Sequence, residues 1–271
     1  MRVAADKMAL PRLGWRIPMT VNATEVGQMK RAALPSRSDA QSSYDALLFD
    51  KRLAQAGPKE IIEEAARAMP GRLAVVSSFG TESAVLLKFV ADVDPSLPIL
   101  FLDTLWLFKE TLAYRDVLIA RLALTDVRTV TPSPSALALR DAKRDLCFRD
   151  RDACCGIRKV APLAKELEAF DGWISGRKRY HGGERAALAV VETDGPRLKF
   201  NPLARLTSAE LNAIFESTNL PRHPLEALGF ASVGCIPCTT RPPAGTSVRG
   251  GRWSGLAKTE CGIHTMAPPA T

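Results

Sequence analysis

The sequence lacks several features that would place it in common classes of protein. No uninterrupted apolar run approaches the roughly 18 to 20 residues that a membrane-spanning helix requires. The N-terminus has no apolar segment followed by a small-residue cleavage site. No Gly/Ser-rich linker divides the 271 residues, which suit one large α/β domain or at most two small ones. We therefore expect a cytoplasmic protein with one main domain and no membrane partner.

The charge is distributed unevenly along the chain. Residues 1–42 carry more basic than acidic side chains and scattered prolines, which predicts a loosely ordered basic extension. We expect the main domain at 43–248 and a mobile tail at 249–271. The formal net charge of +8 suits an anionic partner, either nucleic acid or a small sulfated or phosphorylated nucleotide. Charge by itself does not choose between these partners.

Apolar periodicity predicts strands that alternate with helices. Helical spacing runs through 45–54 and 60–69 and ends at Pro70-Gly71. Further on, strands are expected at 72–78, 97–103, 126–132 and 172–177, with helices at 79–90, 107–122 and 154–170. This alternation predicts a parallel sheet covered by helices on both faces. Beyond Arg205 we expect a helix followed by an irregular region.

In such sheets ligands bind beyond the carboxyl ends of the strands. The loop after the first expected strand reads SSFGTES and begins with Ser77, Ser78, Phe79, Gly80 and Thr81. Hydroxyls and a glycine at the start of a helix can hold a phosphate or sulfate, although the same residues also suit a plain capped turn. The loop matches no Walker motif.

The six cysteines fall into recognisable groups. Cys154 and Cys155 are adjacent, and Cys235 and Cys238 form a CxxC pair. Four thiolates in two pairs can hold an iron–sulfur cluster or a tetrahedral zinc ion. Neighbouring side chains on a helix diverge by about 100°, which favours the wider [4Fe-4S] cluster over zinc. Cys147 has no partner at ligand spacing and is expected to pack in the core.

Eight motifs or groups of motifs follow one another along the chain: SSFGTES, LDT with ET, CCGIRKVAPL, WISGRKR, FNPLARLT, LPRHPLEALGFASVGCIPCT, RGGRW and ECGIH. In this order they resemble the assimilatory adenylyl-sulfate reductases, specifically the branch that carries a cluster. The resemblance covers residues of roughly 73 to 264. The resemblance implies an adenine-nucleotide alpha hydrolase-like sheet, a [4Fe-4S] cluster on the four paired cysteines, and adenosine 5′-phosphosulfate as substrate.

The resemblance also implies a role for individual residues. Cys261 resembles the nucleophile that takes the sulfonyl group, AMP leaving, before thioredoxin or glutaredoxin releases sulfite. The loop of residues 77–81 would hold the phosphosulfate. The strand ends at Leu102, Asp103 and Thr104 would border the adenosine, with Gly176 and Arg177 completing the pocket. The residues implied to neutralise or contact the anion are Arg158, Lys159, Arg249, Arg252 and His264.

Other classes of function remain open at this point. A tRNA-thiolating ATP pyrophosphatase shares the sheet and can carry a cluster, but its loop should read near Ser-Gly-Gly-x-Asp-Ser, from which Phe79 and Glu82 depart. A zinc-bearing nucleic-acid module would explain the charge and the CxxC pair but not the tail. A reductase of the 3′-phosphorylated nucleotide is a third alternative. No thioredoxin-like pattern follows Cys261, so we expect a separate reductant and no nucleic-acid partner. A homo-oligomer stays open.

Overall fold

A computed structural model describes residues 38–256 and 258–264. The expected extension at 1–42 therefore lies largely outside the described residues, as do positions 265–271 of the expected tail. The expected boundary at residue 42 falls inside the first helix, α1 (Asp39–Arg52). Both domain boundaries stay predictions.

A six-stranded sheet, counted over the described residues, forms the centre of the fold in the order β3-β2-β1-β4-β6-β5. Its strands are β1 (Leu73–Ser77), β2 (Ile99–Leu102), β3 (Val127–Val130), β4 (Gly172–Ser175), β5 (Val191–Asp194) and β6 (Arg197–Phe200). Neighbouring strands are parallel except β5 and β6. The chain moves outward from β1 to β3 and then crosses to β4. The carboxyl ends of β1 and β4 therefore flank a crevice where such sheets bind ligands.

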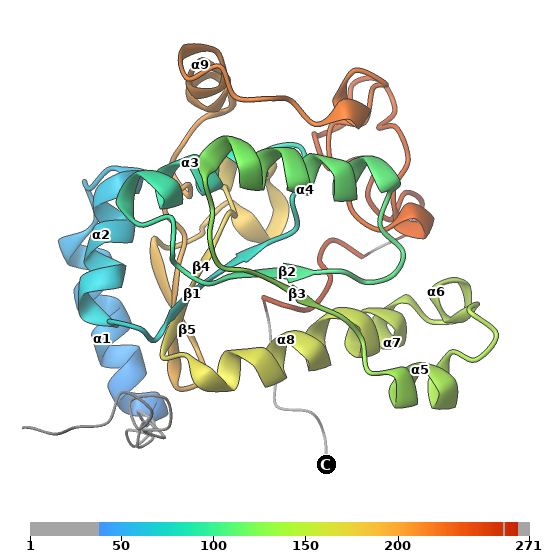
Figure 1. Ribbon diagram of the computed structural model, residues 1–271, viewed down its shortest axis with the longest axis horizontal. Coiled ribbons are helices and arrows are strands. Elements are labelled where there is room, and N and C mark those ends of the chain that lie inside the picture. Colours follow the sequence, from blue (N-terminus) through green and yellow to red (C-terminus); the bar gives the residue numbers. More distant parts are fainter. Residues whose placement is uncertain (1–37, 257, 265–271) are drawn as a thin grey trace, which may run out of the picture. The chain divides into compact units, whose positions relative to one another are not determined.

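Helices cover both faces of the sheet, as the sequence predicts (Figure 1). One core joins β1 residues such as Val75 to α2 (Pro58–Ala68), α3 (Ser83–Val93), α4 (Lys109–Leu122) and α9 (Ser208–Ser217). On the other face Trp173 and Leu100 pack against Leu163 of α8 (Ala161–Glu166). Because both faces are buried, β1 reads as a continuous apolar run rather than an alternating one.

The helix expected at 154–170 is divided into segments. It begins as α7 (Arg151–Cys155), widens into a π-helical turn (Gly156–Val160) and continues as α8. A π turn inserts an extra residue per turn and often occurs at functional sites. Here it carries Arg158 and Lys159. Two short helices precede it, α5 (Pro134–Arg140) and α6 (Leu146–Arg149).

The hairpin of β5 and β6 is absent from the sequence-based expectation, which was limited to parallel strands. β6 lies parallel to β4, and β5 adds an antiparallel edge. The two strands are joined through Gly195, whose φ of 58° lies in the left-handed region. An Asp-Gly pair between β-rich runs is a strong hairpin signal. The signal was therefore present, in residues 194–195.

After α9 the chain follows an irregular course, as expected. Short 3₁₀ turns at Pro224–Glu226 and Ile236–Cys238 interrupt it. Three further 3₁₀ turns lie at Leu167–Ala169, Arg179–His181 and Gly183–Arg185. Among the described residues no helix has the length and apolar character needed to span a membrane.

Candidate active site

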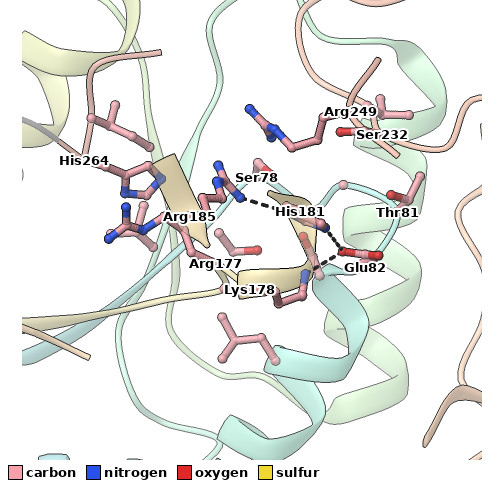
Figure 2. A pocket seen from close by; sticks show the side chains of 18 of the residues that line it. Ser78, Thr81, Glu82, Arg177, Lys178, His181, Arg185, Ser232, Arg249 and His264 are labelled. Carbon is pink, nitrogen blue, oxygen red and sulfur yellow. Dashed lines mark hydrogen bonds and ion pairs between the residues drawn. The ribbon is translucent and has the colours of Figure 1, made fainter. Parts of the chain in front are cut away.

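A pocket of about 840 Å³ opens at the crevice between the carboxyl ends of β1 and β4. Loops from the first half of the chain, the segment after β4 and the C-terminal loop all contribute to its wall (Figure 2). Ten of the residues expected at the site line it: Ser77, Ser78, Gly80, Thr81, Leu102, Gly176, Arg177, Arg249, Arg252 and His264. The position of the pocket follows from the strand order.

The loop after β1 is held rigidly between the core and the C-terminal region. The Ser77 hydroxyl accepts a hydrogen bond from the Phe79 N–H at 3.2 Å, and Thr81 donates to the Ala231 carbonyl at 3.0 Å. Phe79 has a left-handed backbone with φ 47°, and its ring packs edge-on against Phe101. A non-glycine residue adopts this conformation only when its surroundings enforce it. The buried Phe79 ring therefore fixes the loop instead of facing the pocket.

Basic side chains dominate the charge of the pocket. Among the residues that the structure describes, the wall contains one carboxylate, Glu82. It also contains five cations: Arg177, Lys178, Arg185, Arg249 and Arg252. Burial and the neighbouring Arg185 lower the pKa of Arg249 to about 10, although Glu260 acts in the opposite direction. The buried Nε of Arg177 has no hydrogen-bond partner. Four of these cations already pair with carboxylates: Arg177 with Glu192, Lys178 with Glu82, and both Arg185 and Arg249 with Glu260. The excess of basic side chains in the wall and the unused Arg177 donor still suit an anionic ligand.

The C-terminal segment 258–264 lies beside this pocket, and its last two residues, Ile263 and His264, line the wall. Arg185 binds both carboxylate oxygens of Glu260, with the Nη2 contact at 2.8 Å, and Arg249 donates to the Thr259 carbonyl at 2.8 Å. His264 stacks on Trp173 with ring centroids 5.8 Å apart. Gly262 has φ 82°, which favours glycine at this bend. The half-buried Cys261 thus lies in a segment fastened at both ends.

The ring of His264 is partly buried and neutral. Burial lowers its pKa well below the ordinary value, and the cations Arg177 and Lys199 lower it further. Its Nδ1 has no hydrogen-bond partner, while its carbonyl accepts from Lys199 Nζ at 3.3 Å. A neutral imidazole with a free nitrogen can exchange a hydrogen bond with a ligand but does not add a charge.

A second cavity is lined by sulfur. The four cysteines of the two expected pairs meet there with Cys147, and the remaining lining residues are Trp106, Arg151, Arg158, Lys159, Pro237 and Trp253. Ile236 N–H donates to the Trp106 carbonyl at 2.7 Å, which ties the CxxC loop to the segment after β2. The sequence does not reveal that Cys147 faces this cavity, because it has no partner at ligand spacing.

The donor set of the sulfur cavity fits an iron–sulfur cluster. Thiolates are the usual ligands of such clusters, and the pairs Cys154/Cys155 and Cys235/Cys238 line the same cavity. The Thr104 hydroxyl lies 3.2 Å from the sulfur of Cys235, and hydrogen bonds to cluster sulfurs tune such sites. Within the described residues, no three His, Cys, Asp or Glu side chains converge closely enough for one metal ion.

Lys159 lies between the two cavities. Burial by itself lowers its pKa, but the facing sulfur atoms of Cys235 and Cys261 outweigh this effect, so its pKa lies above the ordinary value. The ammonium group is therefore charged and interacts with sulfur on both sides. Its place on the π turn, four residues after Cys155, permits this dual contact.

The remaining expected residues lie away from the pocket wall. Asp103 accepts a hydrogen bond from the Leu105 N–H at 2.9 Å, and Thr104 faces the sulfur cavity. Arg158 is fully buried, forms an ion pair with Asp141 at 2.5 Å and donates to the Thr104 carbonyl at 2.8 Å. These side chains brace the wall between the cavities, and Arg158 is already neutralised.

Four titratable residues of the pocket wall were not among the expected site residues: Glu82, Lys178, His181 and Arg185. Glu82 accepts from Lys178 at 2.6 Å and from His181 at 2.9 Å. Figure 2 shows these side chains converging beneath Arg249. The basic run GRKR directly after β4 points to Lys178, and the loop after β1 contains Glu82, because strand ends carry the ligand-binding residues in this fold. His181 and Arg185 lie beyond that run.

Comparisons with known proteins identify the family. The family model for the phosphoadenosine phosphosulfate reductase domain matches residues 72–241, and the chain belongs to this family. A protein from Chelativorans sp. (strain BNC1), named adenosine 5′-phosphosulfate reductase, is 46% identical over 86% of this chain and 95% of its own length. A protein of the same name from Mesorhizobium japonicum is 47% identical over 76% of this chain and 82% of its own.

Two further comparisons widen the picture. A Gloeobacter violaceus protein named phosphoadenosine 5′-phosphosulfate reductase is 40% identical over 76% of this chain and 88% of its own. The crystal structure of a phosphoadenylyl-sulfate reductase from Candida auris superimposes with a TM-score of 0.61 at 24% identity, over 72% of this chain and 96% of that one. At this identity the likeness concerns the fold, which the sheet and flanking helices confirm.

Proposed function

We propose that the protein reduces adenosine 5′-phosphosulfate to sulfite and AMP. The observation that carries this proposal is the position of Cys261, in a segment that lies beside a pocket lined by five cations and one carboxylate. The two relatives above 45% identity, both named for this activity, support it. The reaction would serve assimilatory sulfate reduction and cysteine biosynthesis in the cytoplasm.

The reaction proceeds in two stages. The Cys261 thiolate attacks the sulfate sulfur, the bond from sulfur to the bridging phosphate oxygen breaks, and AMP leaves with the bonding electrons. A thiolate of thioredoxin or glutaredoxin then attacks Cys261 Sγ in the S-sulfocysteine. Sulfite leaves with the electron pair of the broken S–S bond, and a second reductant thiol resolves the mixed disulfide. The reductant thus supplies both electrons and ends as a disulfide.

The cations of the pocket neutralise charge where it develops. An anionic nucleophile that approaches a sulfate is repelled, so nearby positive charge lowers the barrier. Arg177, Arg249 and Arg252 are the candidates for contact with the phosphosulfate, and Lys159 faces the Cys261 thiolate. The loop of Ser77 to Thr81 would hold the phosphate end, since its hydroxyls and backbone line the same wall.

The sulfur cavity would hold a [4Fe-4S] cluster on Cys154, Cys155, Cys235 and Cys238. When bound, the cluster supplies a fixed concentration of charge beside Lys159. The electrons of the reaction come from the reductant thiols, so an electrostatic and structural role is sufficient. The protein's own contribution is the dry wall of Trp106, Trp253 and Pro237 around the thiolates.

The test is to incubate the full-length protein with labelled adenosine 5′-phosphosulfate in the absence of reductant. The mass of the peptide that contains Cys261 is then measured by mass spectrometry. A sulfo adduct on that peptide supports the proposal. Label on another residue would contradict the proposed role of Cys261. No adduct together with active ATP hydrolysis would favour the pyrophosphatase alternative. The Gloeobacter relative is named for the 3′-phosphorylated nucleotide, so parallel assays with that nucleotide test which of the two substrates this protein prefers. Faster turnover of that nucleotide would reassign the substrate.

A further inference from the structure

His181 occupies the junction between the pocket and the C-terminal segment. It ends the 3₁₀ turn Arg179–His181, and its side chain is 7% exposed. Both ring nitrogens have partners. Nε2 lies 2.9 Å from Glu82 Oε2, and Nδ1 lies 3.1 Å from Arg185 Nη1. Neither the sequence motifs nor the reaction described above assigns this residue a role.

The two partners fix the protonation state of the ring. Arginine can only donate, so Nδ1 must accept the hydrogen bond from Arg185. Nε2 then carries the proton and donates it to the Glu82 carboxylate. The geometry therefore assigns a neutral imidazole in a single tautomer, with a donor on one side and an acceptor on the other.

Arg185 transmits this arrangement to the nucleophile's segment. One of its terminal nitrogens is bound to His181, while its Nε and its other terminal nitrogen bind the two oxygens of Glu260. A planar guanidinium held at three points has a fixed orientation. Glu260 directly precedes Cys261 and also lies 3.5 Å from Arg249.

We propose that His181 is a positioning residue whose neutral ring aligns Arg185, and through Glu260 holds Cys261 beside the pocket. It also connects the tail to Glu82, at the start of α3, where the proposed phosphosulfate loop ends. A change at the loop can therefore reach the tail through four hydrogen-bonded side chains. This inference deepens the proposed function, because it names what sets the position of the proposed nucleophile.

Protonation of the ring would undo the arrangement. A proton on Nδ1 would face an N–H of Arg185, so that hydrogen bond would be lost. Several charged or titratable side chains surround the ring of His181. They are Glu82 before α3, Lys178 and Tyr180 in the neighbouring positions of the chain, Arg185 in the next turn, and Arg249 in the C-terminal loop. Burial lowers the pKa of His181, Glu82 opposes this, and Lys178 and Arg185 add to it.

The sign of the pH effect follows from this direction. Since the pKa of the enclosed ring lies below its ordinary value near ~6.5, the arrangement favours the neutral ring. The hydrogen bonds that hold segment 258–264 in place are therefore complete above the ordinary pKa of histidine. They weaken as the pH falls through the lowered pKa of His181.

The experiment measures exposure of Cys261 in the absence of substrate. The full-length protein is treated with iodoacetamide and cleaved after Lys258, which yields a peptide whose only cysteine is Cys261. His181→Leu, which has neither donor nor acceptor, should be alkylated about tenfold faster than the parent protein. His181→Gln, whose amide offers one acceptor and one donor, should remain within about twofold.

The pH dependence gives a second readout. The ratio of parent to His181→Gln alkylation rates cancels the common change in thiolate fraction. This ratio should be near one at pH of about 8 and rise toward pH of about 5, because only histidine titrates in this range. A flat ratio would overturn the role of the neutral ring.

A third variant perturbs the same chain of contacts without replacing His181, so the proposal stays testable if His181→Leu misfolds. Glu260→Gln weakens the Arg185 fork directly and should increase alkylation to a similar extent. Combined with His181→Leu it should add little, since both act through one chain of contacts. Parent-like alkylation of His181→Leu or Glu260→Gln, or full additivity, would overturn the proposal. Because no substrate is present, these outcomes are independent of whether Cys261 accepts a sulfonyl group.

Discussion

The two cavities on either side of Lys159 are built in different ways. The basic pocket draws its wall from the ends of β1, β2 and β4, the two 3₁₀ turns after β4 and the C-terminal loop. The sulfur cavity is assembled from the helical segment around Cys154 and Cys155 and the loop around Cys235 and Cys238. The wall of the basic pocket is polar and contains five cations. The wall of the sulfur cavity combines three cations with five cysteines, two indole rings and a proline.

This difference matches what each cavity would hold. A nucleotide with a phosphosulfate group needs many donors in an open site, whereas a cluster needs few, soft ligands in a closed one. Lys159 and Cys261 lie where the two meet. Substitutions that affect one cavity without the other would show how far the two are independent.

The largest effect is expected for Cys261→Ser. A serine hydroxyl is a far weaker nucleophile than a thiolate at neutral pH, so sulfite release should fall by on the order of 10⁴-fold or more. The nucleotide dissociation constant, measured by calorimetry or filter binding, should change by less than about threefold, since Cys261 is not in the pocket wall. Loss of binding along with activity would mean that the pocket depends on the thiol.

Cys235→Ser tests the sulfur cavity. Replacing one of four thiolate ligands should remove the brown colour and most of the bound iron, measured by visible absorbance and metal analysis. The matched control is Cys147→Ser, because Cys147 lines the same cavity and is expected only to pack there. The control should keep its iron. If both variants lose it, the ligand set would have to include Cys147.

Asp141→Asn tests the wall beside the sulfur cavity. Asp141 pairs with the buried Arg158 at 2.5 Å and accepts from the Leu146 N–H at 2.9 Å. Removing its charge leaves a buried guanidinium unpaired, which should cost about 3 to 5 kcal/mol of unfolding free energy in denaturant titrations. Asp92→Asn, in the more exposed pair with Lys88, should cost less than about 1 kcal/mol.

The same pair has a defined pH dependence. Burial raises the pKa of Asp141, but hydrogen bonds from Arg158 and the Leu146 N–H lower it more, so the net pKa is below its usual range. Its stabilisation is therefore complete above the unfolded pKa of about 3.9 and lost as pH falls through the folded value. Stability of Asp141→Asn should approach that of the parent protein in acid. An acid-independent difference would contradict the ion pair.

The smallest effect concerns Gly234→Ala. An added Cβ would overlap the guanidinium of Arg252, the flexible end of a side chain in the pocket wall. The fold should tolerate the change, but displacing one cation should weaken nucleotide binding about tenfold. Gly156→Ala, where no atom lies within 4 Å of the new Cβ, serves as the control. Equal affinities of the two variants would remove Arg252 from the anion site.

Much of the fold could be predicted from local patterns. Apolar runs located β1 to β4, and the switch to helical spacing located α2, α3 and α4. Ser77 and Gly176, expected at the site because they lie at strand ends, line the pocket, while their role in binding stays a prediction. The β5–β6 hairpin was not predicted, although the Asp-Gly pair at residues 194–195 is a local signal for it.

The choice among basic residues could not be predicted in the same way. Arg158 and Arg185 are both arginines near motifs, yet Arg158 is paired with Asp141 in the core and Arg185 reaches Glu260. His181 and Glu82 are 99 residues apart, and Arg185 and Glu260 are 75 apart. No periodicity in a window of one helix or strand contains such pairs.

By itself, then, the sequence determined the alternation of strands and helices, the two cysteine pairs and the ECGIH motif around Cys261, because each is encoded within a few neighbouring positions. Only the tertiary structure decided which cations face the pocket, that Cys147 joins the sulfur cavity, and that His181 connects Glu82 to the nucleophile's segment. Those outcomes depend on which buried charges find partners across the fold, and a charge removed from water is stable only beside its partner.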